Sequence, residues 1–211
     1  MTAVFVRLLY MLFLFQNDVL RIPLLDAEYY LKWAHEILQG GIIGSKIFFT
    51  EPFYAYLLAF FLGLFGDTLG QTMLILFQFL LGSFFPALLY FVGKRMLSRD
   101  IGIIAGVIAS LYGPYVFYEG LLLKTSLEIY FLPLFLWYLY ESFQKPSKKQ
   151  FYIGGVFLGL LALIKGNVVV FLPVVFFLIW HLLKDEGRKT QAVLATLFFL
   201  GVITVISPIA F

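Results

Sequence analysis

Asp26 stands within the only long polar stretch of the chain, residues 17–51, and has the clearest potential for chemistry there. A carboxylate at this position fits two roles. It can cap a helix that Gly40 and Gly41 would end, because Asp is a preferred N-cap residue, and spacing alone favours this role. Held at a membrane surface, it can also act as a general base. The roles are compatible, since a cap fixes where a carboxylate points.

Three further charged residues stand in apolar surroundings. Glu119 and Lys124 flank an expected turn, and Lys124 can also pair with Glu128 one helical turn later. Lys165 lies in a short loop between two apolar runs. Charges at a membrane edge are costly and usually functional. A lysine there suits a lipid phosphate, and an anchoring role at headgroup depth is equally open. We expect Gln78, within an apolar run, to join helices.

An integral membrane protein must position these residues. Of 211 residues, 62% are hydrophobic, 26 are phenylalanine and 13% are charged, against about 25% charged in soluble domains. This excludes a soluble enzyme, a disulfide scaffold and a disordered chain. The chain has no cysteine and only His35 and His181 as histidines, so a cysteine or multi-histidine metal site is excluded. The net charge of +3 follows from the loops described next, and we expect no nucleic-acid partner.

The fold class expected is an all-α polytopic membrane protein of about seven transmembrane helices. Three loops, around residues 94–99, 145–149 and 184–189, each hold three basic residues, or nine of the 15 in the chain. Such loops face the cytoplasm, so the N-terminus lies inside, and the first long loop and Phe211 lie outside. The expected spans are residues 3–15, 71–93, 101–117, 121–140, 151–164, 168–183 and 191–206.

Two segments of the first outward loop, residues 17–70, are expected to be helices that do not cross the membrane. Residues 26–41 carry an apolar face, so this helix should lie in the membrane plane; the face comprises Tyr30, Trp33, Ala34, Ile37 and Leu38. Residues 53–65 are apolar, but a crossing there would place the first basic loop outside. Their helix would also be about 20 Å long, against a bilayer core of about 30 Å. We expect a membrane-dipping segment; a short tilted span is the alternative.

Small residues and prolines predict how the helices pack. Gly102 and Gly106, and likewise Gly155 and Gly159, follow the small-xxx-small spacing of closely packed membrane helices. Prolines inside the spans are expected to kink them; these are Pro86, Pro133 and Pro173.

Several motifs, taken in order, resemble GT-C glycosyltransferases, most nearly the protein-mannosyltransferase-like and lipid A aminoarabinose-transferase-like groups. Asp26-Ala-Glu-Tyr-Tyr and Glu51-Pro-Phe-Tyr-Ala-Tyr resemble the first outward loop of that family. Residues 118–127 are similar to its second outward turn, and residues 159–167 to its lysine hairpin. Two departures stand out. Ala27 separates Asp26 from Glu28, where relatives often have adjacent acids, and Glu51 directly precedes Pro52, where relatives often insert a basic residue.

The resemblance implies a sugar transferase that uses a polyprenyl-phosphate-linked donor on the extracytoplasmic face of the plasma (inner) membrane. Asp26 would be the catalytic base and Lys165 would contact the carrier phosphate. No cofactor is certain, and a divalent metal requirement stays open. The acceptor would be a lipid, a glycan or a protein. Substrate-binding residues would be Lys165, Glu28, Glu51, Tyr54, Glu119 and Lys124.

Length leaves an alternative function open. The chain is expected to be a single domain that matches only the N-terminal module of longer relatives, so a partner chain would supply missing contacts. A non-catalytic module that binds carrier lipid or a partner protein is therefore the alternative. A transporter is disfavoured, because its ionisable residues would lie at mid-bilayer, whereas here they cluster at the expected membrane edges.

Overall fold

The structure is a computed structural model that describes residues 2–17, 23, 25–40 and 51–210. Every regular element in those ranges is a helix, which confirms the all-α class. Contacts divide the chain into two compact units, Met1–Pro133 and Leu134–Phe211.

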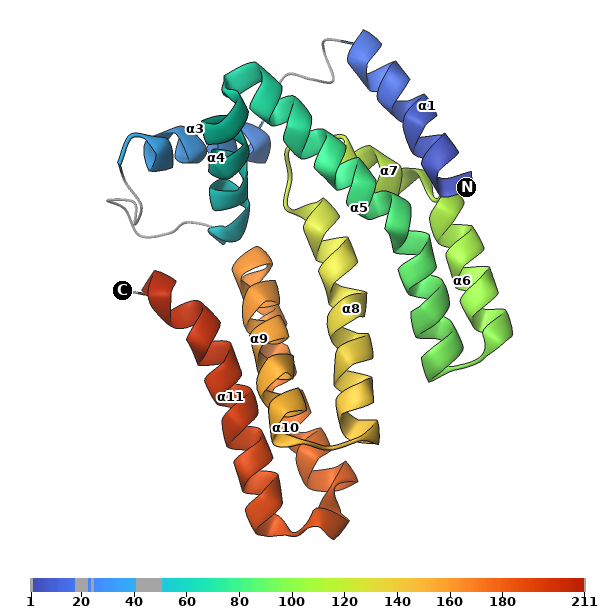
Figure 1. Cartoon of the computed structure of the whole chain (residues 1–211), viewed down its shortest axis with the longest axis vertical. Helices are drawn as coiled ribbons and strands as arrows, with labels where there is room; N and C mark the ends of the chain where they lie inside the picture. The colour runs from blue at the N-terminus through green and yellow to red at the C-terminus, as the bar shows by residue number, and fades with distance from the viewer. Residues whose placement is uncertain (1, 18–22, 24, 41–50, 211) are drawn as a thin grey trace. The chain divides into compact units, whose positions relative to one another are not determined.

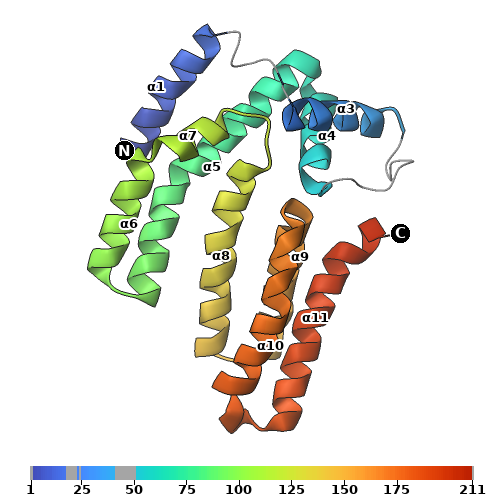
Figure 2. The ribbon, with the colours of Figure 1, turned by 180° about the vertical axis from the view of Figure 1, so that it is seen from behind.

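The first unit is built around one long helix, α5 (Asp67–Met96). α6 (Arg99–Leu111) returns along one half of α5, and α1 (Thr2–Gln16) contacts both α5 and α6, with its N-terminal end beside α6 (Figures 1 and 2). Short α7 (Gly113–Glu119) follows α6, and α8 (Thr125–Gln144) begins after the loop that ends at Lys124.

In the first unit, the predicted glycines Gly102 and Gly106 allow α6 to pack closely on α5. A Cβ at Gly106 would lie 3.0 Å from the carbonyl oxygen of Pro86, and one at Gly102 would lie 2.8 Å from the backbone nitrogen of Lys94. α5 and α6 thus approach backbone to backbone, as small-xxx-small spacing predicts.

α3 (Asp26–Leu38) and α4 (Phe53–Phe65) form the first-loop part of this unit. The bounds of α4 match the predicted segment, and Gly66, with φ of 76°, ends it before α5 begins. The predicted cap of α3 was wrong by one residue: Leu25 is the N-cap and makes no side-chain cap bond, so Asp26 is the first helical residue. Gly40, with φ of 109°, follows the helix as predicted, while Gly41 lies outside the described residues.

The apolar face of α3 meets protein. Tyr30, Trp33 and Ala34 are all buried, and α3 packs crosswise on α4 (Figures 1 and 2). A helical repeat of apolar residues indicates that one face of the helix is shielded from water. It does not indicate whether lipid or protein shields that face. Protein covers these three side chains, and the position of α3 in the membrane plane stays a prediction.

Among the described residues, two helices are long and apolar enough to span a membrane, α5 and residues 188–208 of α11 (Arg188–Ala210). A third span is possible if α6 and α7, bent by 55° at their junction, count as one. Of the other predicted spans, α8 has 20 residues but is not apolar enough to qualify, and the rest are shorter helices. α1, for example, has 15 residues, or about 22 Å against a core of about 30 Å. The structure thus shows two to three candidates and does not show seven.

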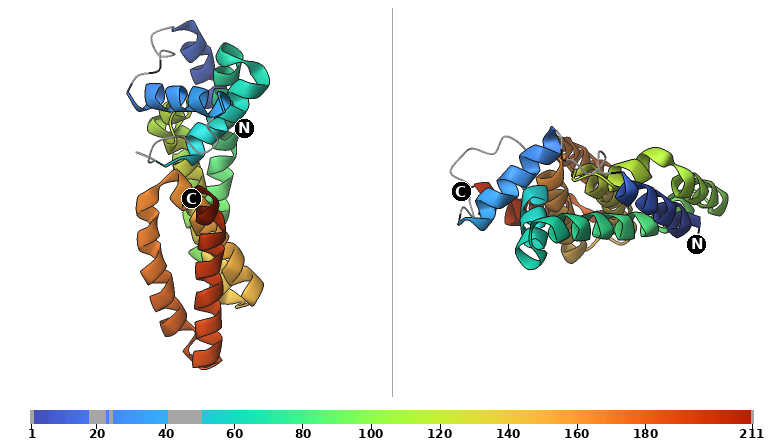
Figure 3. Two further views of the ribbon diagram at one scale, coloured as in Figure 1. Left: turned by 90° about the vertical axis from the view of Figure 1, so that its left-hand side faces the viewer. Right: turned by 90° about the horizontal axis from the view of Figure 1, so that it is seen from above.

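The second unit holds the end of α8 with α9 (Lys148–Ile164), the 3₁₀ turn η1 (Gly166–Val170), α10 (Phe171–Leu182), the 3₁₀ turn η2 (Lys184–Glu186) and α11. α10 and α11 run antiparallel and join at one end (Figure 3). The loops α8–α9 and α10–α11, both basic, lie at that same end of the unit (Figure 1), as the orientation predicted. Pro173 falls in the first turn of α10, where proline is tolerated; Pro86 and Pro133 lie inside helices.

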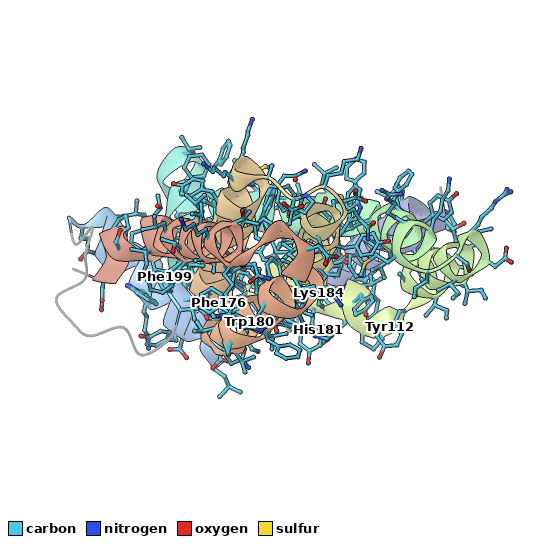
Figure 4. The ribbon with its side chains drawn as sticks, turned by 90° about the horizontal axis from the view of Figure 1, so that it is seen from below. Tyr112, Phe176, Trp180, His181, Lys184 and Phe199 are labelled. Atoms are coloured by element: carbon cyan, nitrogen blue, oxygen red, sulfur yellow. The ribbon has the colours of Figure 1, made fainter. Side chains whose placement is uncertain are left out.

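Aromatic and charged side chains mark the basic end of this unit. Figure 4 views this end and labels Trp180, His181 and Lys184. The Arg188 guanidinium lies 5.8 Å from the centre of the Trp180 ring, and His181 stacks on Phe177 with ring centres 5.7 Å apart. Trp180 is exposed. Trp and Arg at a helix end are typical of a membrane interface.

Gly155 is the tightest contact of the second unit and gives a stability prediction. A Cβ there would overlap the carbonyl oxygen of Phe198 on α11, because α9 and α11 touch through their backbones. Gly155→Ala should therefore lower the thermal unfolding midpoint in detergent, since overpacking typically costs about 1–3 kcal/mol. Gly113→Ala is the matched control, because nothing lies within 4 Å of a Cβ there. Equal midpoints for the two variants would contradict the packing.

Candidate functional site

Arg7 and Glu119 form a buried ion pair in the first unit. Arg7 Nε and Nη2 donate to Glu119 Oε2 and Oε1 at 2.7 and 2.6 Å. The two residues are 2% and 5% exposed. Two parallel charge-assisted bonds fix both position and orientation. Gly82 of α5 makes room for the pair, because a Cβ there would overlap the Glu119 carboxylate.

Gln78 continues the polar contacts from Glu119 towards α4. Its Nε2 donates to the main-chain oxygens of Glu119 and Leu121, each at 2.8 Å. Its Oε1 accepts from the Tyr54 hydroxyl at 2.8 Å. Both side chains are buried, so a polar group from each helix is satisfied within the protein. The prediction that Gln78 joins helices is confirmed.

Beyond Tyr54, the contacts continue to Tyr30 of α3. They end at an ion pair between Lys124 and Glu51. The Tyr30 and Tyr54 rings meet edge to face, with centres 5.0 Å apart. Lys124 Nζ donates to Glu51 Oε2, and the two side chains are 19% and 23% exposed. They are the partly accessible end of an otherwise buried set. We call this set the polar network; it comprises Arg7, Glu119, Gln78, Tyr54, Tyr30, Lys124 and Glu51.

The environment of Lys124 keeps it cationic. Burial lowers the pKa of Lys124, but the hydrogen bonds to Glu51 and Tyr30 and their charges raise it more, so that the pKa lies above its usual value. A raised lysine pKa favours the folded, charged form; this stabilisation is complete below the ordinary lysine pKa and is lost only as pH rises through the folded value. Lys124 therefore carries a positive charge throughout the physiological range.

Four of the predicted site residues belong to the polar network, and three lie elsewhere. Asp26 is exposed at the start of α3 and precedes Tyr30 by one helical turn. Glu28 pairs with Lys32 at 2.6 Å on the exposed face of α3, as acids and bases spaced i,i+4 do. Lys165 belongs to the second unit, where it ends α9. The four within the network are Glu51, Tyr54, Glu119 and Lys124.

Sequence reasoning missed the roles of Arg7 and Tyr30. Arg7 interrupts an apolar run, and a charge in such surroundings requires a partner; that signal was readable, but the partner, 112 positions away, was not. Tyr30 was assigned to a membrane-facing surface. The contact between Lys124 and Glu51 was also missed, because only the local pairing with Glu128 was considered.

His35, on the polar face of α3, contacts Asp67 Oδ1 through Nε2 at 2.9 Å. This ties the exposed face of α3 to the first residue of α5. Within the described ranges, no three histidine, aspartate or glutamate side chains come together in a way that could hold a metal ion.

The helices and the polar network define a membrane protein with a charged, partly accessible cluster in its first unit. A comparison with known families matches residues 50–210 to the dolichyl-phosphate-mannose-protein mannosyltransferase family. The chain belongs to this family, which is of the GT-C type of glycosyltransferase. Neither curated proteins nor solved structures gave a match. The matched range includes Glu51, Tyr54, Glu119, Lys124 and Lys165 and begins after Asp26 and Glu28.

Proposed function

We propose that the chain transfers a sugar from a polyprenyl-phosphate donor to an acceptor hydroxyl with inversion at the anomeric carbon. Membership of a glycosyltransferase family supports the reaction class. The observation that carries the site is the partly accessible pair of Lys124 and Glu51 against Tyr30. Its positive charge suits a phosphate-bearing headgroup, and its carboxylate can accept hydrogen bonds from sugar hydroxyls.

Asp26 is proposed as the general base. It takes the proton of the acceptor hydroxyl while that oxygen forms a bond to the anomeric carbon and the bond from this carbon to the phosphate oxygen breaks. The leaving group is polyprenyl phosphate. The position of Asp26 supports this role, since the carboxylate is exposed and lies one turn from Tyr30 on the same helix.

Lys165 is proposed to contact the carrier phosphate and to neutralise the charge that grows on it as the sugar leaves. Glu28 is proposed to contact substrate from the exposed face of α3. Lys165 is half-buried at the end of α9, a place where a long side chain can extend its charged end to the membrane surface.

The site is proposed to face the extracytoplasmic side of an inner membrane that seven helices cross, with the first loop outside. The support is the distribution of charge. In the second unit, both loops rich in lysine and arginine lie at one end (Figure 1), and such loops remain in the cytoplasm. A partner chain is proposed for acceptor contacts.

The proposal is tested in membranes that contain the overproduced protein, supplied with polyprenyl-phosphate sugars labelled in the sugar. The label should move from the donor to a lipid, glycan or protein fraction, faster than in membranes without the protein. Donor binding to the purified chain without any such movement would favour the non-catalytic module instead.

A further inference from the structure

The loop from Gly120 to Lys124 carries Lys124 but belongs to no helix. Its first residues are held from two sides. A Cβ on Gly120 would lie 2.9 Å from the Tyr10 ring and 3.2 Å from the Leu14 side chain, so α1 packs directly on the loop. Gln78 of α5 binds the carbonyl oxygens of Glu119 and Leu121. Two helices therefore set where the loop begins.

The ion pair of Arg7 and Glu119 anchors this loop at its first point. Glu119 is the last residue of α7, and its carboxylate is gripped by both arms of the Arg7 fork. The fork fixes direction as well as distance. Lys124 follows Leu121, the second held residue, by three positions, so little freedom remains between the anchored end and the Lys124 side chain.

We infer that Arg7, Glu119 and Gln78 are positioning residues that hold Lys124 beside Glu51 in the proposed sugar-transfer site. They act through the loop, and none of them needs to touch substrate. The inference rests on the proposed function for its consequence in catalysis, but the placement of Lys124 can be measured without any turnover.

Because the chain contains no cysteine, introduced pairs of cysteines can measure how close Lys124 lies to Glu51. In the otherwise unchanged protein, Glu51→Cys together with Lys124→Cys puts one thiol at each of the two positions that the ion pair joins, and a bismaleimide long enough to replace the two longer side chains should link them. The yield of the link reports how closely the loop approaches Glu51. A second pair, Tyr152→Cys with Thr204→Cys, reports the second unit, because these hydroxyls lie 3.1 Å apart.

The test combines the first cysteine pair with Arg7→Met and Glu119→Met. Replacing both partners of a buried pair by apolar residues usually preserves folding, so the variant should accumulate. We expect the 51–124 link to fall several-fold while the 152–204 link in the same background is unchanged. Gln78→Leu, which frees the two carbonyls, should lower the 51–124 link independently. Ser110→Ala on α6 is the control and should leave it intact.

An unchanged 51–124 link in both backgrounds would overturn the inference. The same substitutions without the added cysteines should raise the donor KM more than they lower kcat. If the link falls but no preparation transfers sugar, the placement stands and the proposed function fails. If transfer is robust and the link does not fall, the proposed function stands and this inference fails.

Discussion

Asp26→Asn should reduce sugar transfer by about 10²–10⁴-fold, the usual contribution of a general base. The amide is close in shape to the carboxylate but cannot take the proton of the acceptor hydroxyl. Asp26 is exposed at the first position of α3 and provides no side-chain cap, so the helix should remain intact. The measurement is the initial rate of label transfer at saturating donor.

Glu36→Gln is the matched control for this change. Glu36 lies on the exposed face of the same helix and loses the same charge. Its variant should transfer sugar at nearly the normal rate. Near-normal turnover in Asp26→Asn would remove Asp26 from the mechanism, whatever the control shows.

Arg7→Met should destabilise the first unit by about 3–5 kcal/mol, the usual cost of leaving one partner of a buried pair uncompensated. Glu119 would keep its carboxylate buried beside Gly82 without its charged partner. The measurement is the unfolding midpoint in denaturant, monitored by the fluorescence of Trp33 in the first unit, in a background in which the other two tryptophans are replaced by phenylalanine.

The double variant Arg7→Met with Glu119→Met separates the cost of a lone charge from that of the lost contact. It should recover most of the stability, because neither charge then remains buried. A single variant as stable as the unchanged protein would show that Glu119 is not confined as described.

The all-α fold class and the bounds of α4 could be predicted from the sequence, because both depend on local composition. Residues 53–65 contain only apolar and aromatic side chains and one glycine between two helix-ending signals, and α4 has those bounds. The glycine pairs also followed from spacing, since close helix contact requires a missing side chain at both positions.

The surroundings of each helix could not be read in the same way. The periodic apolar face of α3 is equally suited to lipid and to α4, and the structure places Tyr30 and Trp33 against protein. The Arg7–Glu119 pair of the polar network joins α1 to the last residue of α7. Such pairings depend on how distant helices pack, which no spacing along the chain records.

The lengths of the helices and the breaks between them explain why the structure shows fewer candidate spans than the seven predicted. Between Leu111 and Gly113 the chain bends by 55°, and Pro114 lies in the first turn of α7, a position that proline suits. An apolar run that seemed continuous over residues 101–117 is thus divided. Hydropathy measures composition over a window and does not detect such a break.

The central claim, that this GT-C-type chain is a sugar transferase with its base at Asp26, is tested most directly by product stoichiometry. Purified protein in liposomes receives polyprenyl-phosphate sugar, labelled in both the sugar and the lipid, with an extract of acceptors. We expect equal amounts of glycosylated acceptor and free polyprenyl phosphate from the unchanged protein, and almost none of either product from Asp26→Asn. Donor that stays intact with the unchanged protein, or equal product from both proteins, would contradict it.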